Sequence, residues 1–294
     1  MATVSAAAAR AAVSTAGALG VTCADPVVLA DGANVIVHLR PSPVVAKVAA
    51  STPAVRADVA AWLKRELDMA IFLTGAGAPV MAPSREVPAT VHHGGGHVMS
   101  FWTYLEPSGT GSPDEATIGS MLRDLHAVLR TCPVPPPVLT PLADIPAFLA
   151  RPRTVLSAAD VSLLAGIYSR LTEDLLTEDL LTEDPTTGTD PVQALHGDAG
   201  AGNLMAAGGQ WVWHDFEDTC SGPVAWDLAA TTTSPRFDRS RILAAYGDSV
   251  DAAQLRTCER LRRLHLTIWY ALYAERLPEC RQRAADLLAS WQAT

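Results

Sequence analysis

Residues 195–205 read Leu-His-Gly-Asp-Ala-Gly-Ala-Gly-Asn-Leu-Met, and the run Trp-Val-Trp at 211–213 is followed by His214 and Asp215. Transfer of a phosphoryl group to an alcohol requires a carboxylate that aligns the hydroxyl and takes its proton. It also requires hard oxygen ligands that hold magnesium nearby. Asp198 can be the base, and Asn203 can present an amide oxygen from the same loop. Asp215, at the end of the next expected strand, can bring a second metal-binding carboxylate, so the stretch predicts a phosphoryl-transfer loop.

Motifs around this loop resemble one family. His196-Gly197-Asp198 with Asn203 resembles the HGDxxxxN catalytic loop of aminoglycoside phosphotransferases and related small-molecule kinases, and Asp215-Phe216-Glu217 is similar to the metal-binding strand end of that family. The segments 222–229 (GPVAWDLA) and 122–126 (LRDLH) match its G-x-x-x-W-D-L-A and L-x-x-L-H patterns. The resemblance spans roughly residues 28–229, with the motifs in the order that the family has.

The resemblance implies a bilobal protein-kinase-like fold of the α+β class, with a β-rich N-terminal lobe and a mainly helical C-terminal lobe. The implied activity is phosphorylation of a small-molecule hydroxyl by ATP or GTP with Mg²⁺. Candidate acceptors are an aminoglycoside or another antibiotic, an amino sugar, choline or an amino alcohol, and the sequence selects none of them. The sequence lacks the A-P-E segment of protein kinases, which argues against a protein substrate.

The same resemblance assigns nucleotide-binding residues in the N-terminal part. Lys47, in the run Val-Val-Ala-Lys-Val, matches the lysine that steadies the α- and β-phosphates. Glu66, on the helix expected next, is similar in placement to the glutamate that pairs with this lysine, and Asp58 and Asp68 are the alternatives.

The nucleotide base is expected to lie against the connecting segment 99–103 (Met-Ser-Phe-Trp-Thr), which makes Ser100 and Trp102 candidate contacts. The turn 31–34, which includes Asn34, would cover the phosphates, although it lacks a G-x-G-x-x-G loop.

Apolar periodicity and turn residues predict the elements. Strands are expected over 26–30, 34–39, 44–48, 87–91, 96–105, 193–195 and 211–213, and helices over 55–73, 113–129, 158–171 and 254–291. The alanine-rich first twenty residues are interpreted as a frayed or helical leader. We expect two domains: 1–103 would be the nucleotide-binding lobe with its hinge, and 104–294 the catalytic and acceptor-binding lobe.

Residues 171–184 read LTEDLLTEDLLTED, which is a five-residue repeat. On a helix, each repeat turns the leucines by about 140°, so they form no single apolar face. The repeat is therefore predicted to face solvent, to be loosely ordered and to lie outside the active site.

The composition of the chain indicates which partners and which location to expect. The chain has 294 residues, of which 49% are apolar, which is enough for a substantial core. Its 31 acidic and 22 basic residues give a net charge of −9, which argues against a nucleic-acid partner. The five cysteines are scattered without a C-x-x-C pair, and no apolar run approaches the length of a membrane span. We therefore expect a cytoplasmic protein with reduced thiols, whose partners are a nucleoside triphosphate and a small acceptor, without nucleic acid or membrane.

Some residues keep two interpretations. Asp227 would cap a helix or brace the catalytic loop, and Glu217 would either support the site or contact substrate or metal. His92, His93 and His97 could suggest a metal site, but a solvated hairpin is favoured. The aromatic residues of the last long helix could line an acceptor pocket, although aromatics on helices usually belong to the core. These aromatic residues are Trp269, Tyr270 and Tyr273. The rival function is a non-catalytic nucleotide-binding regulatory protein with the same fold.

Overall fold

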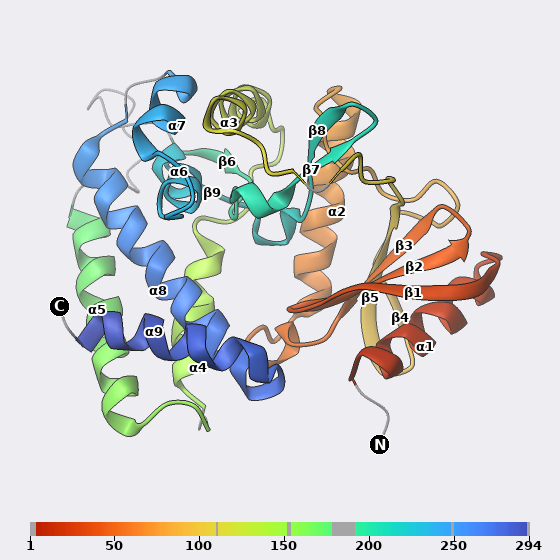
Figure 1. Ribbon diagram of the computed structural model, residues 1–294, viewed down its shortest axis with the longest axis horizontal. Helices are drawn as coiled ribbons and strands as arrows, with labels where there is room; N and C mark the ends of the chain where they lie inside the picture. The colour runs from red at the N-terminus through yellow and green to blue at the C-terminus, as the bar shows by residue number, and fades with distance from the viewer. Residues whose placement is uncertain (1–3, 110, 152–153, 178–191, 248–249, 293–294) are drawn as a thin grey trace. The chain divides into compact units, whose positions relative to one another are not determined.

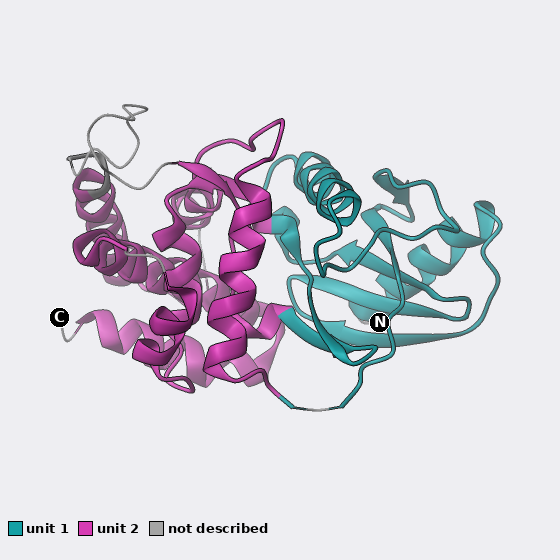
Figure 2. Ribbon diagram, turned by 90° about the horizontal axis from the view of Figure 1, so that it is seen from above, with its two compact units in different colours: residues 1–111, 204–217 teal, residues 112–203, 218–294 magenta. Residues whose placement is uncertain are grey.

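The computed structural model in Figure 1 describes residues 4–109, 111–151, 154–177, 192–247 and 250–292. The chain forms two compact units, which Figure 2 shows in two colours. Unit 1 comprises residues 1–111 and 204–217, and unit 2 comprises residues 112–203 and 218–294. The expected functional division at residue 103 stays a prediction. The predicted α+β class is confirmed, because an antiparallel sheet in the N-terminal part is followed by a mainly helical region.

Unit 1 is built on a five-stranded antiparallel sheet whose strands lie in the order β1-β2-β3-β5-β4. Its strands are β1 (Cys23–Asp31), β2 (Asn34–Pro41), β3 (Val44–Ala49), β4 (His92–Gly94) and β5 (His97–Thr103). Successive side chains of a strand point to opposite faces of the sheet. On β3, Val44, Ala46 and Val48 belong to the core cluster that contains helix α1. Lys47 must therefore point to the opposite face, where Val45 packs with Leu67 of helix α2.

Helix α1 (Val4–Ala18) covers the first of these faces. The buried side of α1 consists of alanines, whose small side chains let the helix lie close to the strands. These alanines are Ala8, Ala11, Ala12 and Ala16. The glycines of the His-His-Gly-Gly-Gly turn fit this close packing, because a Cβ on Gly94 would lie 2.0 Å from Thr15 Oγ1 and one on Gly95 would lie 2.8 Å from Ala11 Cβ. The alanine-rich start of the chain is thus a helix that belongs to the core of unit 1.

Helix α2 (Val59–Gly75) lies on the opposite face and overlaps the helix predicted over 55–73, with both ends a few residues later. Asp58 caps its N-terminus by accepting a hydrogen bond from Ala61 N at 3.1 Å. Its buried side contains one charged residue, Glu66, whose side chain therefore lies between the helix and the sheet. A short 3₁₀ turn, η1 (Thr52–Ala54), connects β3 to this helix.

The prediction of a strand over residues 87–91 is wrong, because the strand that pairs with β5 begins at His92, after the predicted strand ends. Pro88 has no N–H to donate to a ladder, and Thr90 N donates locally to Pro88 O at 2.7 Å. The other predicted strands of unit 1 are present, with ends that differ by a few residues.

The hairpin of β7 (Leu204–Ala207) and β8 (Gln210–Trp213) completes unit 1. Backbone hydrogen bonds join it to earlier parts of the unit: Met81 N donates to Trp213 O at 2.8 Å, Trp213 N to Pro79 O at 2.9 Å, and Ser108 N to Ala206 O at 2.7 Å. The tight reversal at Gly208 and Gly209 has positive φ at both residues, which glycine adopts without strain.

Unit 2 is mainly helical and contains a small two-stranded sheet of β6 (Gln193–Leu195) and β9 (Cys220–Gly222). Its helices are α3 (Glu115–Leu129), α4 (Asp144–Leu149), α5 (Ala158–Thr177), α6 (Val224–Thr232), α7 (Arg239–Tyr246), α8 (Ala252–Arg276) and α9 (Arg281–Gln292). Short 3₁₀ turns complete the chain at η2 (Thr140–Ala143), η3 (Ala201–Asn203), η4 (Phe216–Asp218) and η5 (Pro278–Cys280). The single helix expected over 254–291 is divided in two, because Pro278 cannot continue α8.

The start of the five-residue repeat continues α5 to Thr177, so the expectation of loose order is wrong for residues 171–177. Leu171 is buried, which anchors this turn of the helix. The remaining repeat residues, 178–184, lie outside the described residues.

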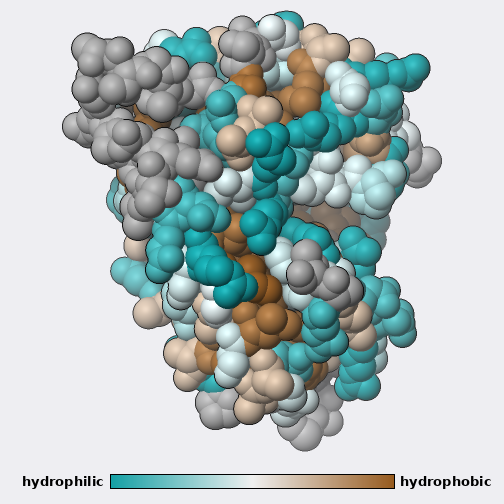
Figure 3. Space-filling view, turned by 90° about the vertical axis from the view of Figure 1, so that its left-hand side faces the viewer, coloured by the Kyte–Doolittle hydropathy of each residue, from teal (hydrophilic) through white to brown (hydrophobic). Residues whose placement is uncertain are grey.

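The face of the molecule in Figure 3 shows hydrophilic side chains with a band of apolar side chains between them. Within the ranges that the structure describes, no helix combines the length and the apolar character that crossing a membrane requires.

Helix α3 packs against α7 through Gly119, which gives a first prediction. A Cβ at this position would lie 2.4 Å from Ile242 O and 2.7 Å from Ala245 Cβ. We expect Gly119→Ala to lower the free energy of unfolding by about 1–3 kcal/mol, because the two helices must separate. Gly166→Ala in α5 is the matched control, because its Cβ would meet only Arg170 Nη1 at 3.6 Å. Chemical denaturation measures both, and equal effects would contradict the role of Gly119.

Candidate active site

The predicted catalytic loop begins where β6 ends, at His196 and Gly197. Gly197 has φ +86°, and a Cβ there would lie 1.8 Å from Asp218 O, so no other residue fits this position. The backbone must make this close approach for the chain to turn from a buried strand to Asp198, whose side chain is 41% exposed. The loop thus carries its carboxylate from the core to the surface of unit 2.

Asp227, in the first turn of α6, braces this loop. Its carboxylate is fully buried, and it accepts hydrogen bonds from His196 N and Gly197 N, both at 2.8 Å. His126 Nε2 lies 3.1 Å from the same carboxylate. Pro223 occupies the N-cap position of α6, so the geometry favours the brace over the cap. The contacts join three of the sequence motifs, because His126 ends L-x-x-L-H and Asp227 belongs to W-D-L-A.

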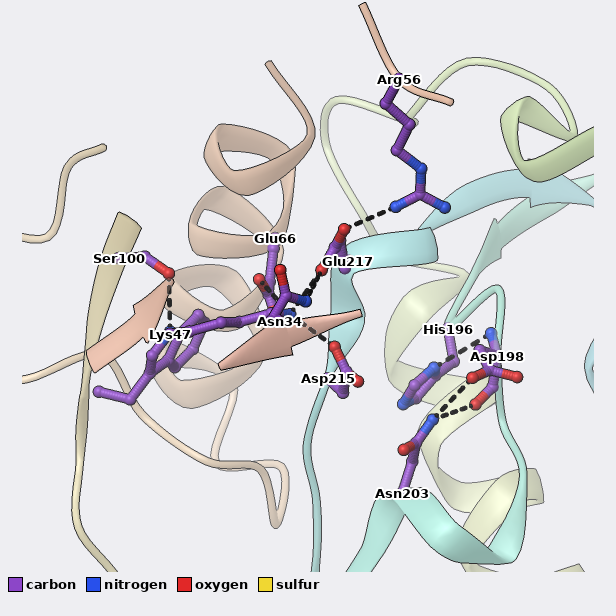
Figure 4. Close-up of polar contacts among 11 residues, drawn as sticks. Asn34, Lys47, Arg56, Glu66, Ser100, His196, Asp198, Asn203, Asp215 and Glu217 are labelled. Carbon is purple, nitrogen blue, oxygen red and sulfur yellow. Dashed lines mark hydrogen bonds and ion pairs between the residues drawn. The ribbon is translucent and has the colours of Figure 1, made fainter. Parts of the chain in front are cut away.

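Asn203 lies at the other end of the loop and points toward Asp198, as Figure 4 shows. Its Nδ2 donates to the Asp198 carbonyl at 2.7 Å and to Asp198 Oδ2 at 3.1 Å. The amide oxygen of Asn203 is then the atom left for a metal ion. Arg262 of α8 contacts the second carboxylate oxygen, Asp198 Oδ1.

In unit 1, the buried Lys47 is the centre of a group of charged side chains, of which Glu66 and Glu217 are buried and Asp215 is 43% exposed (Figure 4). Its Nζ lies 2.8 Å and 2.9 Å from the two carboxylate oxygens of Glu66. Of the three acids considered for this pairing, only Glu66 contacts Lys47, since Asp58 caps α2 and Asp68 pairs with Lys64 at 2.7 Å. Lys47 also lies 2.5 Å from Asp215 Oδ1 and 3.0 Å from Glu217 Oε2.

Asp215 has positive φ, +64°, which few residues other than glycine adopt. Asp tolerates this left-handed conformation better than most side chains, and such residues cluster at functional sites. The backbone turns sharply here between β8 and η4, with Lys47 beside the carboxylate.

Glu217 ties several residues of unit 1 together. Its carboxylate is buried and accepts from Asn34 Nδ2 at 2.6 Å and from Arg56 Nη1 at 2.7 Å (Figure 4). Asn34 therefore faces the charged group with its side chain, and its buried Oδ1 has no hydrogen-bond partner among the described residues. Sequence reasoning missed Arg56, which precedes α2 and carries no motif; its guanidinium also lies 3.6 Å from the centroid of Trp62.

Burial and neighbouring charges shift the pKa values of both Lys47 and Glu66. Burial opposes the charge of Lys47, but the carboxylates of Asp215, Glu217 and Glu66 outweigh it and hold the Lys47 pKa well above its ordinary value. Burial raises the pKa of Glu66 to about 8; Asp215 and Glu217 add to the rise, and Lys47 opposes it. Lys47 thus contacts three acidic side chains, and Arg56 contacts one of them, Glu217.

The clustered acidic side chains, together with the Asn34 oxygen that has no partner among the described residues, suit a hard cation in the vicinity of Asp215. Within the described ranges, no three His, Cys, Asp or Glu side chains form a ready-made metal cage. Mg²⁺ is commonly held by one or two carboxylates together with the phosphates of a substrate, and the residues present fit that mode.

Ser100 and Trp102 lie within strand β5, on the same face of the sheet as Lys47. Ser100 is opposite Lys47 in the ladder, and its hydroxyl accepts from Trp102 Nε1 at 2.9 Å. Both side chains are buried. Neighbouring backbone groups are also paired, since Thr103 N donates to Ala82 O at 3.0 Å and Phe101 O accepts from Ser84 N at 3.0 Å. The segment expected to connect the lobes is therefore sheet as far as Thr103.

The high pKa of Glu66 predicts a pH-dependent stability. Unfolded Glu66 releases its proton near its ordinary pKa of 4.5, whereas the folded protein keeps that proton until about pH 8. Between these values the folded state binds more protons, so its stability falls as pH rises. We expect the unfolding free energy of the wild type to fall relative to that of Glu66→Gln as the pH rises from 4.5 to about 8. Denaturant titrations of both proteins test this, and parallel pH curves would contradict it.

The fold and these two groups of residues define a class, the small-molecule phosphotransferases with a kinase-like fold. One unit has a β-sheet carrying a lysine–glutamate pair, and the other has a braced loop that presents an aspartate and an asparagine.

Sequence comparison gives the family. The chain matches the phosphotransferase enzyme family over residues 29–264, and it belongs to that family. The sequence prediction of an enzyme of the aminoglycoside phosphotransferase type is thereby confirmed. Compared with curated proteins, the chain matches none.

Solved structures share the fold at low identity. An amicoumacin kinase, solved with AMP-PNP and Ca²⁺, is 14% identical with a TM-score of 0.67, over 96% of this chain and 92% of the other. The choline kinase of Streptococcus pneumoniae is 15% identical with a TM-score of 0.64, over 95% and 98%. An aminoglycoside phosphotransferase from Streptomyces rimosus is 18% identical with a TM-score of 0.62, over 86% and 97%. These likenesses confirm the predicted fold.

Proposed function

We propose that this protein transfers the γ-phosphoryl group of ATP or GTP to a hydroxyl of a small molecule, with Asp198 as the base. The proposal depends on one observation, which is that the backbone of the Asp198 loop is held in place while the Asp198 carboxylate is exposed. The loop backbone is fixed by a fully buried aspartate, while the Asp198 carboxylate itself is 41% exposed. A carboxylate that is rigidly held yet open to solvent suits a base that must meet a diffusing acceptor.

In the proposed reaction, the acceptor oxygen attacks the γ-phosphorus while its proton passes to the Asp198 carboxylate. The bond between the γ-phosphorus and the β–γ bridging oxygen breaks, and the nucleoside diphosphate leaves with that oxygen. Phosphoryl transfer depends mainly on positioning and charge, so the protein has to orient the two substrates and stabilise the phosphates. Asp198 orients the acceptor, and Lys47 contacts the α- and β-phosphates while Glu66 keeps it in place.

Asn203 and Asp215 would hold Mg²⁺, through an amide oxygen and a carboxylate. When bound, the ion neutralises phosphate charge. Asp215 now contacts Lys47, so binding of the ion and its nucleotide would loosen this contact and leave the ammonium to the phosphates.

The nucleotide base would lie near the end of β5, where we place the contacts of Ser100 and Trp102. Both side chains are buried, so they would support the wall of the base site and the backbone beyond Thr103 would supply the hydrogen bonds. Asn34 would stabilise the phosphate-covering turn through Glu217. Nucleotide binding by 1–103, catalysis and acceptor binding by 104–294, and a cytoplasmic location belong to the same proposal.

The proposed acceptor is an aminoglycoside-like compound, an amino sugar or an amino alcohol. Solved structures of similar fold include an amicoumacin kinase, a choline kinase and an aminopropanol kinase. The compounds in these three names all carry a cationic nitrogen at neutral pH. The net charge of −9 is compatible with such an acceptor.

The decisive experiment incubates the protein with Mg²⁺ and ATP or GTP and a panel of hydroxyl compounds. The panel pairs kanamycin, choline, aminopropanol and glucosamine with neutral compounds of similar size. Release of nucleoside diphosphate and the mass of the phosphorylated product are both measured. We expect one amine-bearing acceptor to be phosphorylated in preference to its neutral partner.

Nucleotide binding without any phosphorylated product would favour the rival function, a non-catalytic nucleotide-binding regulatory protein. Preference for the neutral compounds would overturn the proposed acceptor class but not the reaction.

A further inference from the structure

Arg262 of helix α8 contacts the proposed catalytic loop at Gly197 and Asp198. Its side chain is 11% exposed. Nη2 contacts Asp198 Oδ1, and Nη1 donates to Gly197 O at 3.0 Å. The planar guanidinium thus binds a carboxylate and the neighbouring carbonyl at the same time, which a single ammonium cannot reproduce with fixed geometry.

Packing holds Arg262 in this orientation. Its guanidinium carbon lies 5.1 Å from the centroid of the Trp226 ring, and Trp226 Nε1 donates to the same Gly197 carbonyl at 2.9 Å. Gly197 is therefore bound on its carbonyl by Arg262 and Trp226, and on its N–H by Asp227. These contacts hold the loop backbone at Gly197, next to Asp198.

Arg262 and Asn203 together fix that side chain. Arg262 contacts Oδ1, whereas Asn203 Nδ2 donates to Oδ2 at 3.1 Å. A carboxylate oxygen accepts more than one hydrogen bond, so Oδ2 can also receive the proton of an acceptor hydroxyl. The contact of Oδ1 with the guanidinium is charge-assisted and the contact of Oδ2 with the amide is not, so Oδ2 is the better proton acceptor of the two.

We propose that Arg262 is a positioning residue for phosphoryl transfer, which holds the Asp198 carboxylate with Oδ2 toward the acceptor. This inference rests on the proposed function, since it assumes that Asp198 is the base. Arg262 acts through Asp198, since its own contacts are with Asp198 Oδ1, the Gly197 carbonyl and the Trp226 ring. Its loss should therefore lower kcat and leave nucleotide affinity as it is.

The test is a double-mutant cycle of Arg262→Met and Asp198→Ala, with the acceptor that the panel identifies and Mg²⁺–ATP. We expect Arg262→Met to lower kcat by about 10- to 100-fold, as misplacement of a catalytic group does, with little change in the KM for the acceptor. In the Asp198→Ala background, the same change should have no further effect beyond about two-fold, since two residues acting as one unit are not additive. Arg262→Lys, which keeps the charge but not the fork, should recover part of the lost kcat.

Arg263→Met is the matched control, because this neighbouring arginine donates to Ser290 O at 3.0 Å and lies over Trp291 instead. It should leave kcat at the wild-type value. AMP-PNP affinity and the unfolding midpoint are measured for every variant, so that a folding defect is recognised; should Arg262→Met not fold, the cycle uses Arg262→Lys.

The outcomes separate the two hypotheses. Additive losses in the cycle, or an Arg262→Met protein with wild-type kcat, would overturn the role of Arg262 while Asp198 stays the base. Wild-type turnover in Asp198→Ala, or no phosphorylated acceptor at all, would overturn the proposed function and the role of Arg262 with it.

Discussion

Replacing Asp198 by alanine is expected to lower the turnover of acceptor phosphorylation by about 10²- to 10⁴-fold, which is the usual contribution of a general base. Nucleotide binding should stay close to that of the wild type, because the residues proposed to contact the phosphates, Lys47 and Glu66, form their own buried group. Steady-state kinetics measure the first effect, and titration with AMP-PNP and Mg²⁺ measures the second.

Two further variants make this result specific. Asp198→Asn keeps the shape of the side chain but weakens the contact with Arg262, and it should be about as inactive as the alanine variant. Asp124→Ala removes a surface carboxylate of α3 that is 67% exposed, and it should retain wild-type turnover. If Asp198→Ala turned over at the wild-type rate, another group would have to be the base.

Replacing Asp215 by alanine should affect both nucleotide binding and turnover. We expect the enhancement of AMP-PNP binding by Mg²⁺ to be lost, with at least about a ten-fold weaker affinity in its presence, or roughly 1.4 kcal/mol. Without Mg²⁺ the variant should bind AMP-PNP as well as the wild type or more tightly, because Lys47 loses a competing carboxylate at 2.5 Å and keeps Glu66.

Calorimetric titrations with AMP-PNP, in the presence of Mg²⁺ and in the presence of a chelator, measure these two affinities. Asp68→Ala is the control, since its carboxylate pairs with Lys64 on the surface of α2 and should not influence either titration. An Asp215→Ala protein that still bound AMP-PNP more tightly with Mg²⁺ than without it would place the metal ligand elsewhere.

The fold could be predicted from the sequence because the motifs that resemble the phosphotransferase family stand in the order that the family has. In β3 every second residue is packed against α1, which places Lys47 on the α2 face, where Glu66 is the buried acid of the helix. The candidate catalytic loop could be predicted because its residues are close in sequence and their spacing is specific.

The residues that were missed are those that reach the site only through packing. Arg262 is 64 positions from Asp198, on a helix with several arginines, and nothing in its local sequence distinguishes it from Arg263. Arg56 likewise contacts Glu217 across 161 positions. The predicted start of β4 was early because apolar spacing was given more weight than Pro88, which cannot donate to a ladder.

Neither unit is a continuous piece of the chain, since residues 204–217 complete unit 1 from within the sequence of unit 2. A fragment ending at residue 111 would lack Trp213, the partner of Pro79 and Met81 in two backbone hydrogen bonds. A chimera that joins residues 1–111 of this protein to the remaining sequence of a relative would therefore combine unit 1 with the β7–β8 hairpin of the other protein. Grafting that respects the architecture needs three junctions, at 111/112, 203/204 and 217/218, and the second of these falls directly behind Asn203.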